Sequence, residues 1–326
     1  MGQSKSSKID VTIAIPTFNG EEYLEDLLVS VYGQSTKLKY EVLIIDSGSK
    51  DKTLSIIKGF PQARLHLIPN SEFGHGKTRN LAVKMSKGNY TVFLSQDAVP
   101  ANKEWLDSMI EPFYISEKVF CVFGKQIPRP DADATTKREV STVFDSLGPD
   151  HSIMLHRGKS LVSGNKLSQQ LTFFSDVNSA VRKSLSVNDI PYRDVSYAED
   201  QLLGIDVLER GFLKAYSPDA VVSHSNKYSL SKYFNRRVDE FSATKRLLGI
   251  NVEHRLSRLL KTYLIDVKND WVFTLKDKDY SLHQKIQNYI EIPYRNFQKQ
   301  RASYIVGVNK KIEHHSLEAI ERKLNN

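Results

Sequence analysis

Short apolar runs alternate with amphipathic stretches through the first part of the chain. The runs are rich in Val, Ile and Phe, as buried parallel strands are, and they lie at 11–15, 41–45, 64–68, 90–94 and 119–123. Between them, apolar side chains recur at helical spacing in 21–32, 51–58, 75–85 and 103–113. This alternation predicts an α/β fold with a Rossmann-like, mainly parallel sheet and helices on both faces.

The pattern changes after residue 124. The stretch 125–170 has weak periodicity, several prolines and many charges, so we expect an insertion or loop region there. A strand at 172–174, a helix at 201–210 and a strand at 220–223 are expected to complete the core. From about residue 230 onward the apolar spacing is helical.

These patterns predict two domains. The first, 1–224, holds the alternating α/β pattern. The second, 225–326, is a basic and mainly helical C-terminal region.

Positive charge is concentrated in the C-terminal region. The chain has a net charge of +8, and residues 225–326 hold 20 of its 46 basic residues but only 11 of its 38 acidic ones. A basic, aromatic-rich helical tail can lie against an anionic membrane surface, and a solvated helical face is the alternative. We expect a membrane-surface or oligomer contact here and no nucleic-acid partner, and the sequence leaves the oligomeric state open.

Two features bear on the compartment. No stretch approaches the roughly 18–20 apolar residues of a spanning helix, and the first ten residues hold no apolar run typical of a signal peptide. The single cysteine, Cys121, excludes an internal disulfide and is expected to be a buried strand residue. We therefore expect a cytoplasmic protein, with the inner face of the cytoplasmic membrane as a peripheral location.

Polar residues directly follow the predicted strands, at the sheet edge where ligands bind. Pro16, Thr17 and Asn19 follow the first strand, and Asp46 and Gly48 follow the second. Asp46 can accept hydrogen bonds from a base imide or a ribose hydroxyl, while Gly48 lets the backbone approach a ligand. An Asp-Ser-Gly turn is also common after a strand for local reasons, so both interpretations stay open.

Asp97, after the fourth strand, is the first candidate metal ligand. A carboxylate there can join diphosphate oxygens in coordinating Mg²⁺ or Mn²⁺. His224 ends the run 220–223 and is a candidate second ligand if that strand end faces Asp97. A structural role is the commoner one for a histidine at such a position.

Glu199 and Asp200 precede the predicted helix 201–210 and are the candidates for a general base. Because carboxylates are favoured at helix N-termini in any case, capping is the competing explanation. Adjacent residues at a helix start point in different directions, so we expect only one of the two to face a substrate.

The sequence GHGKTRN at 74–80 invites a phosphate-loop interpretation. A Walker loop needs glycine where Ser71 stands, so we exclude an ATPase. Arg79 instead lies in the early turns of a predicted helix, where its guanidinium and free backbone amides can meet a diphosphate.

Taken in order, these motifs resemble those of family 2 glycosyltransferases over about 9–245: PTFN at 16–19, DSGS at 46–49, GHGKTRN, QDA at 96–98, YAED at 197–200 and His224. The resemblance implies a GT-A fold and inversion of the anomeric carbon in one displacement. It also implies that 1–224 is the catalytic domain, with a nucleotide-binding part at about 9–124 and an acceptor side at about 125–224. The segments FGHGKTRN at 73–80, QDA and FSDVNSA at 174–180 look most like bacterial rhamnosyltransferases, which build surface polysaccharides from dTDP-rhamnose.

The resemblance also implies roles for the candidate residues. Four would hold the nucleoside: Pro16, Thr17, Asn19 and Asp46. Arg79 would bind the nucleotide side, and Asp97 with His224 would bind the metal. Asp200 would be the base, supported by Glu199. The acceptor would be a saccharide linked to polyprenyl diphosphate.

Two departures from the family pattern refine these expectations. Ser95-Gln96-Asp97 keeps only the second carboxylate of the usual Asp-x-Asp, so metal affinity is expected to be modest, and Gln96 becomes a candidate ribose or phosphate contact. The region 235–238 lacks the Gln-x-x-Arg-Trp signature of processive members, which favours single-sugar transfer.

Three alternatives stay open: a UDP-sugar donor on the same fold, a sugar nucleotidyltransferase, and a non-catalytic nucleotide-sugar binding module. Pro-Thr-Phe-Asn-Gly stands where a nucleotidyltransferase has its glycine-rich loop, and a mere binder has no evident need for Glu199 and Asp200.

Overall fold

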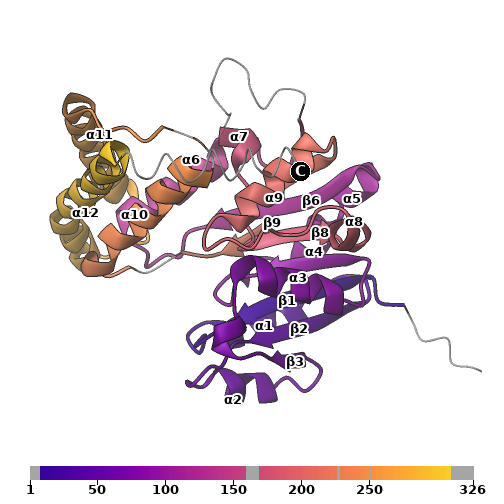
Figure 1. Ribbon diagram of the computed structural model, residues 1–326. Helices are drawn as coiled ribbons and strands as arrows, with labels where there is room; N and C mark the ends of the chain where they lie inside the picture. Colours follow the sequence, from indigo (N-terminus) through magenta and orange to yellow (C-terminus); the bar gives the residue numbers. More distant parts are fainter. Residues whose placement is uncertain (1–7, 159–168, 226–227, 248, 250, 310–326) are drawn as a thin grey trace, which may run out of the picture. The chain divides into compact units, whose positions relative to one another are not determined.

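The computed structural model describes residues 8–158, 169–225, 228–247, 249 and 251–309 (Figure 1). The chain forms two compact units, Met1–Gln126 with Phe144–His224, and Ile127–Val143 with Ser225–Asn326. The second unit therefore combines a segment from the middle of the chain with the C-terminal helices. The functional division of the chain into nucleotide, acceptor and C-terminal parts stays a prediction.

The first unit is built on a sheet whose described strands run in the order β3-β2-β1-β4-β8-β6-β9-β5, with β7 paired to β9. The parallel half comprises β1 (Val11–Thr17), β2 (Tyr40–Asp46), β3 (Arg64–Leu67) and β4 (Tyr90–Leu94). The remaining strands are β5 (Val99–Pro100), β6 (Val119–Ile127), β7 (Met154–Arg157), β8 (Asn178–Arg182) and β9 (Leu213–Ser223). β8 runs antiparallel to both β4 and β6, and β9 runs antiparallel to β5 and β7.

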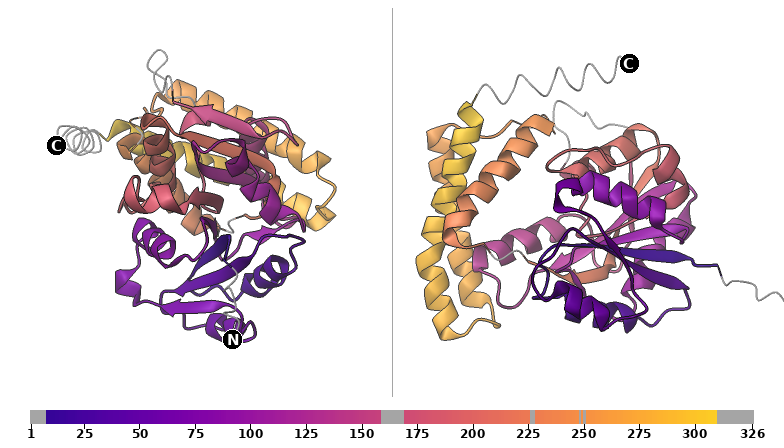
Figure 2. Two further views of the ribbon diagram at one scale, coloured as in Figure 1. Left: turned by 90° about the vertical axis from the view of Figure 1, so that its right-hand side faces the viewer. Right: turned by 60° about the horizontal axis from the view of Figure 1, so that its bottom comes forward.

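Helices cover both faces of this sheet, as Figures 1 and 2 show. They are α1 (Leu24–Tyr32), α2 (Thr53–Lys58), α3 (His75–Met85), α4 (Trp105–Ile110), α5 (Pro112–Ile115), α7 (Gln169–Thr172), α8 (Lys183–Asn188) and α9 (Glu199–Glu209), with a 3-10 turn at Asn70–Glu72. Val11, Ile13 and Ile15 of β1 pack with the apolar stripe of α1, while Ala14 is buried on the opposite face. Because successive strand residues point to opposite faces, burial of both sets requires cover on both sides.

The predicted α/β class is confirmed, and the predicted strands and helices of the first part of the chain are present. Two strand predictions need correction. The run 119–123 forms β6 but lies antiparallel to β8, and 172–174 is not a strand, since Thr172 ends α7. Phe174 lies in the core without pairing in the sheet. Its ring packs against Phe123 at a centroid distance of 5.7 Å, which explains the apolar residue at this position.

The stretch 125–170, expected to be an insertion or loop region, contains regular structure. It holds the end of β6, the helix α6 (Ala134–Asp145) and the strand β7, while 159–168 lies outside the described residues. Charged residues interrupt the apolar periodicity of this stretch, but they take part in packing. For example, Arg138 of α6 pairs with the buried Asp270.

The second unit is a helical assembly of residues 134–143 of α6 with α10 (Leu230–Leu247), α11 (Leu256–Lys276) and α12 (Leu282–Val308). A polar network ties its helices together, because the carboxylate of Asp270 accepts hydrogen bonds from Thr135 at 3.0 Å and Asn296 at 2.7 Å. A capping box at Ser281 and Gln284 starts α12. No helix in the described part of the chain is long and apolar enough to cross a membrane.

Candidate active site

The carboxyl ends of β1 and β4 border a pocket of about 270 Å³ in the first unit. Ligand sites of α/β proteins form at such strand ends. Three segments and one further side chain line it: 16–18 after β1, 73–79 around the start of α3, 93–97 at the end of β4, and Asp176. Of the predicted site residues, Pro16, Thr17, Arg79, Gln96 and Asp97 line this pocket.

Asp46 is buried and organises the loop after β2. Its Oδ1 accepts the backbone N–H groups of Gly48 and Ser49, at 3.0 and 2.9 Å, and its Oδ2 accepts the hydroxyls of Thr17 and Ser49, at 2.9 and 2.5 Å. Gly48 has φ +90°, which glycine adopts without strain. The local turn role is therefore present, and a contact between Asp46 and a donor stays a prediction.

Asn19 connects the loops that follow β1 and β2. Its φ of +50° is tolerated by asparagine, its N–H donates to Ser49 Oγ at 2.8 Å, and its Oδ1 accepts the N–H of Lys50 at 2.9 Å. The loops that follow β1 and β2 are thus linked through Asn19, Asp46 and Gly48. These three residues do not line the pocket itself.

Gln96 holds the loop after β1 through both ends of its amide. Its Oε1 accepts the N–H of Phe18 at 2.8 Å, and its Nε2 donates to the carbonyl of Phe18 at 3.1 Å. Gly20 makes room for this side chain, since a Cβ at that position would lie 2.5 Å from Gln96 Oε1. Gln96 therefore shapes the pocket wall, and its predicted ribose or phosphate contact is untested.

Asp97 and His224 are brought together as predicted, with His224 Nε2 3.4 Å from Asp97 Oδ2. His224 is buried, and its Nδ1 lies 3.0 Å from Gln126 Oε1, while Gln126 Nε2 donates to Ser175 Oγ at 3.0 Å. With that amide orientation, Gln126 accepts a hydrogen bond from Nδ1–H and leaves Nε2 facing Asp97. Such a second partner orients metal-binding histidines.

Asp97 and His224 together could bind a divalent metal ion whose remaining coordination positions are filled by a bound substrate. An imidazole nitrogen and a carboxylate oxygen suit Mn²⁺ and, less well, Mg²⁺. Among the described residues, no group of three or more His, Cys, Asp or Glu side chains is placed to hold a metal. The pair would therefore need diphosphate oxygens to complete the coordination.

Arg79 is the centre of a buried ion-pair network. Its Nε lies 2.8 Å from Asp176 Oδ2, and its Nη1 donates to Glu199 Oε1. The Asp176 carboxylate also accepts the hydroxyls of Ser179 at 2.5 Å and Tyr192 at 3.0 Å. The guanidinium is thus committed to two carboxylates, which favours a positioning role for Arg79 beside its predicted contact with the nucleotide.

Asp200 lies next to this network in the first turn of α9. Its Oδ2 accepts the N–H of Asp176 at 3.3 Å. Burial, followed by the negative charges of Glu199 and Asp176, raises the pKa of Asp200 to about 7, although Arg79 opposes the shift. A carboxylate with a pKa near neutrality suits a general base.

Glu199 and Asp200 diverge, as adjacent residues at a helix start were expected to do. Glu199 points to Arg79, whereas Asp200 Oδ1 accepts the N–H of Gln201 at 2.7 Å. Asp200 therefore makes a capping contact, and its role as the base stays a prediction. The preceding residue, Ala198, has φ +62°, a left-handed conformation that is strained for alanine. Such strain often accompanies functional sites.

Sequence reasoning assigned no role to Asp176, Gln126, Phe18 or Phe73. Asp176 lies in the FSDVNSA segment, just before β8. A carboxylate next to a buried strand is the sequence feature that could have indicated its role. The exposed rings of Phe18 and Phe73 line the pocket, at 44% and 36% exposure. Gln126 carries no sequence signal, because its role depends on the packing of β6 beside the end of β9.

The first unit combines a Rossmann-like parallel half with a carboxylate after the fourth strand and a carboxylate pair at a later helix start. These features define the class of protein, a glycosyltransferase with the GT-A fold. The Glycosyl transferase family 2 pattern matches residues 12–187, and the chain belongs to this family. The O-antigen chain rhamnosyltransferase RfbN of Salmonella typhimurium is 30% identical over 233 residues, which cover 70% of each chain. The O-antigen chain rhamnosyltransferase WbaN of Salmonella anatum is 28% identical over 231 residues, again 70% of each.

Solved structures agree on the fold. The mannosyltransferase PcManGT from Pyrobaculum calidifontis, in complex with GDP-Man and Mn²⁺, superposes with a TM-score of 0.55 at 17% identity, covering 93% of this chain and 86% of that chain. Residues 1-349 of S. aureus TarS in complex with UDP superpose with a TM-score of 0.51 at 18% identity, covering 92% and 90%. At these identities the likeness concerns the fold alone.

Proposed function

We propose that this glycosyltransferase moves a single rhamnose, with inversion, from dTDP-rhamnose to a saccharide linked to polyprenyl diphosphate in the synthesis of a cell-surface polysaccharide. The observation that carries the chemistry is the half-buried Asp200, which accepts the N–H of the pocket-lining Asp176 and whose pKa is raised to about 7. The rhamnose donor is supported by the two O-antigen chain rhamnosyltransferases to which the chain is similar.

The donor would bind in the 270 Å³ pocket. Exposed aromatic rings at Phe18 and Phe73 offer apolar surfaces for a base, and the loops ordered by Asp46 and Asn19 lie beside them. The predicted nucleoside contacts at Pro16, Thr17, Asn19 and Asp46, with Gly48, and the predicted Gln96 contact, belong to this proposal.

In the proposed reaction, Asp200 takes the proton of an acceptor hydroxyl, and the oxygen forms a bond to the anomeric carbon of the donor. The bond between that carbon and the diphosphate oxygen breaks, and the nucleoside diphosphate leaves. Glu199 and Asp176 keep the proton affinity of Asp200 high, and Arg79 holds both of these carboxylates in place.

Asp97 and His224 would hold Mg²⁺ or Mn²⁺, with Gln126 orienting the imidazole. When bound, the ion would neutralise charge on the departing diphosphate. The presence of Mn²⁺ with GDP-Man in the structure of PcManGT supports metal use in this fold.

A donor panel tests the proposal. Purified protein would be incubated with dTDP-rhamnose, UDP-sugars and GDP-sugars, with and without Mn²⁺ or Mg²⁺, and released nucleoside diphosphate and saccharide product would be measured. We expect metal-stimulated turnover with dTDP-rhamnose. Preference for a UDP-sugar would replace the donor assignment, and donor binding without turnover on any acceptor would favour the binding module.

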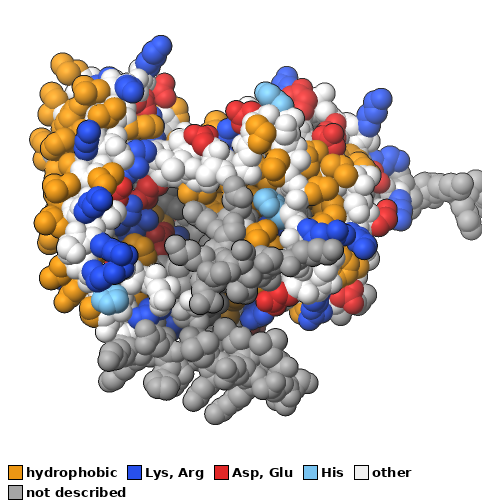
Figure 3. All heavy atoms as spheres, turned by 90° about the horizontal axis from the view of Figure 1, so that it is seen from above, with side chains coloured by type: hydrophobic (Ala, Val, Ile, Leu, Met, Phe, Trp, Pro, Cys, Tyr) orange, Lys and Arg blue, Asp and Glu red, His pale blue; other side chains and the backbone are white. Residues whose placement is uncertain are grey.

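A membrane-bound acceptor requires a surface that reaches the lipid, and the C-terminal helices carry a suitable one. Large apolar side chains are exposed at helical spacing on α11 and α12: Leu256, Leu260, Leu264, Ile265, Trp271, Val272, Leu275, Leu282, Ile286, Ile290, Tyr294, Phe297, Tyr304, Ile305 and Val308. At the left of Figure 3, orange side chains gather over these helices with Lys and Arg among them. We call this set the apolar face.

The charges on the apolar face favour an anionic lipid surface over a second protein copy. Arg258, Lys261, Lys268 and Lys276 are exposed on α11. The acidic residues of α11, Asp266 and Asp270, instead pair with Arg138. Basic amphipathic helices bind anionic membranes by burying apolar side chains beneath their cations. The same exposed cations, of which Arg258 pairs with Glu253, would repel each other between two copies.

Vesicle sedimentation of the full chain tests this part. Leu264→Glu and Ile290→Glu place a carboxylate on the apolar face, and Val29→Glu, at an exposed valine of α1, is the matched control. Vesicles of phosphatidylglycerol and phosphatidylethanolamine should retain the wild type and the control but lose both face variants. Equal retention of all three variants, or loss of a dimer with unchanged vesicle binding, would refute the membrane assignment.

A further inference from the structure

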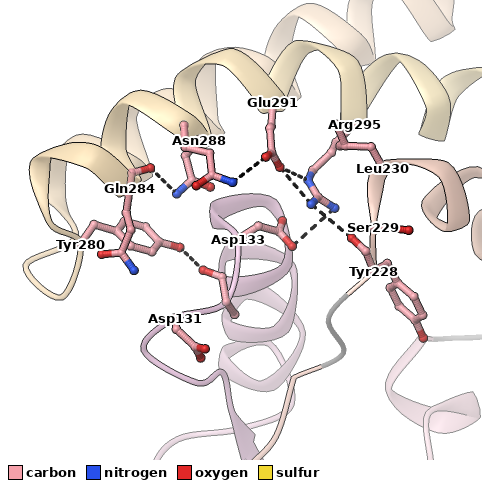
Figure 4. A pocket seen from close by; sticks show the side chains of 12 residues that line it. Asp131, Asp133, Tyr228, Ser229, Leu230, Tyr280, Gln284, Asn288, Glu291 and Arg295 are labelled. Atoms are coloured by element: carbon pink, nitrogen blue, oxygen red, sulfur yellow. Dashed lines mark hydrogen bonds and ion pairs between the residues drawn. The ribbon is translucent and has the colours of Figure 1, made fainter.

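A second pocket, of about 330 Å³, lies within the helical second unit. It is lined by residues 131–133 before α6, residues 228–230 at the start of α10, Tyr280 and one face of α12 (Figure 4). Its size is at the small end of the range of about 300–1,000 Å³ that is typical of small-molecule sites. The proposed transfer chemistry uses none of these residues.

The side chains of this pocket are suited to hydroxyl groups. Gln284 offers its Nε2 and Gln287 its Oε1, because Ser281 and Glu291 bind the other end of each amide, and Asp131 brings a carboxylate. The amide of Asn288 is already bonded to Ala134 and to the carbonyl of Gln284. Amides both donate and accept hydrogen bonds, and carboxylates accept them, which matches the alternating donors and acceptors of a polyol. Tyr280, which is 6% exposed, donates its hydroxyl to the carbonyl of Ala132 and forms part of the pocket wall.

Arg295 supplies a buried donor without a hydrogen bond. Its Nε and Nη2 donate to Glu291 Oε2, at 3.2 and 3.0 Å, and its Nη2 also lies 3.3 Å from the carbonyl of Tyr228. Its Nη1 forms an ion pair with Asp133 Oδ2 at 3.6 Å but makes no hydrogen bond among the described residues. Figure 4 shows Arg295 between Asp133 and Glu291. Because buried donors are almost always satisfied, a ligand oxygen is expected here.

The charge of the lining excludes other small ligands. Asp131, Asp133 and Glu291 outnumber the single guanidinium of Arg295, so phosphates and nucleotides are repelled. The guanidinium between Asp133 and Glu291 in turn disfavours a bound cation, and no metal-holding group of three ligands occurs in the described chain. A neutral, hydroxyl-rich molecule remains.

We propose that this pocket is a saccharide-binding site that holds a neutral sugar unit of the acceptor or product chain, separate from the donor pocket. This assignment rests on the proposed function for the source of the saccharide, but the binding itself needs neither donor nor catalysis. The pocket would raise the affinity of the enzyme for longer acceptors without changing the chemical step.

The test is an NMR titration of the full chain, without donor or metal, with neutral methyl glycosides of L-rhamnose, D-galactose, D-mannose and D-glucose. Gln287→Ala removes an amide that donates to Glu291 Oε1 at 2.8 Å, and Glu291→Gln removes one charge while keeping the shape. Gln300→Ala, on α12 outside the pocket, is the matched control. Phosphate and spermidine serve as anion and cation probes.

We expect at least one glycoside to bind, with Kd raised fivefold or more in both pocket variants and less than twofold in the control. Absence of binding by every glycoside, equal affinity in all variants, or displacement by phosphate or spermidine would overturn the assignment. Because these titrations contain no donor, a failed transferase assay leaves their result intact, and their failure leaves the transferase proposal intact.

Discussion

The pH dependence of transfer should follow the ionisation of Asp200 and respond to its neighbour Glu199. An ordinary aspartate has a pKa of 3.8, so a pKa of about 7 means that ionisation is disfavoured by up to about 4 kcal/mol. Burial is the largest cause and the charge of Glu199 the next. Replacing Glu199 with Gln keeps an acceptor for Arg79 but removes that charge.

We expect Glu199→Gln to lower the pKa of Asp200 by about one unit, which corresponds to about 1.4 kcal/mol. The midpoint of the acidic limb of kcat would then move from about 7 to about 6. At pH 6 the ionised fraction of the base would rise about fivefold, from roughly a tenth to roughly a half, while the plateau would fall because the base is weaker.

The assay is kcat at saturating donor between pH 5 and 9, with each profile normalised to its own plateau. Glu209→Gln, at the other end of α9, is the matched control and should keep the wild-type midpoint. A midpoint that stays near 7 in Glu199→Gln, or moves upward, would refute the electrostatic account of Asp200.

Three further predictions concern the metal pair, the pocket wall and stability. Gln126→Leu removes the partner of His224 Nδ1 and should raise the Mn²⁺ concentration for half-maximal activity about 10-fold or more, with little change at saturating metal; an unchanged metal titration would contradict the role of Gln126. Gly20→Ala should displace Gln96 from Phe18 and raise the donor KM, an effect that Gly59→Ala, outside the pocket, should lack. Because the folded pKa of Asp200 exceeds its unfolded value, its ionisation costs stability as pH rises from about 4 to about 7. Asp200→Asn should therefore melt above wild type at pH 8 and close to it at pH 4 in thermal unfolding, and the reverse order would contradict the pKa shift.

The fold was largely predictable because the buried strands carry their own signal. The runs at 11–15, 41–45 and 90–94 are apolar on both faces, which only a covered sheet explains, and they became β1, β2 and β4. Strand direction was not predictable in this way. The run 119–123 is equally apolar but pairs antiparallel with β8, a partner distant in sequence.

The candidate site was predictable where a residue directly follows a strand. Asp97 and His224 meet at 3.4 Å because their strand ends share one edge of the sheet. The partners of Arg79 were not predictable, because Asp176 and Glu199 reach it from segments whose approach depends on tertiary packing. Sequence spacing carries no information on such contacts.

The central claim is that Asp200 is the base of a sugar transfer, and single-turnover transfer by Asp200→Asn tests it most directly. With dTDP-rhamnose, metal and a lipid-linked acceptor, we expect the variant to bind donor with wild-type affinity and to lose transfer by a factor of about 10²–10⁴, the usual contribution of a general base. Transfer at the wild-type rate, with donor binding intact, would contradict the account.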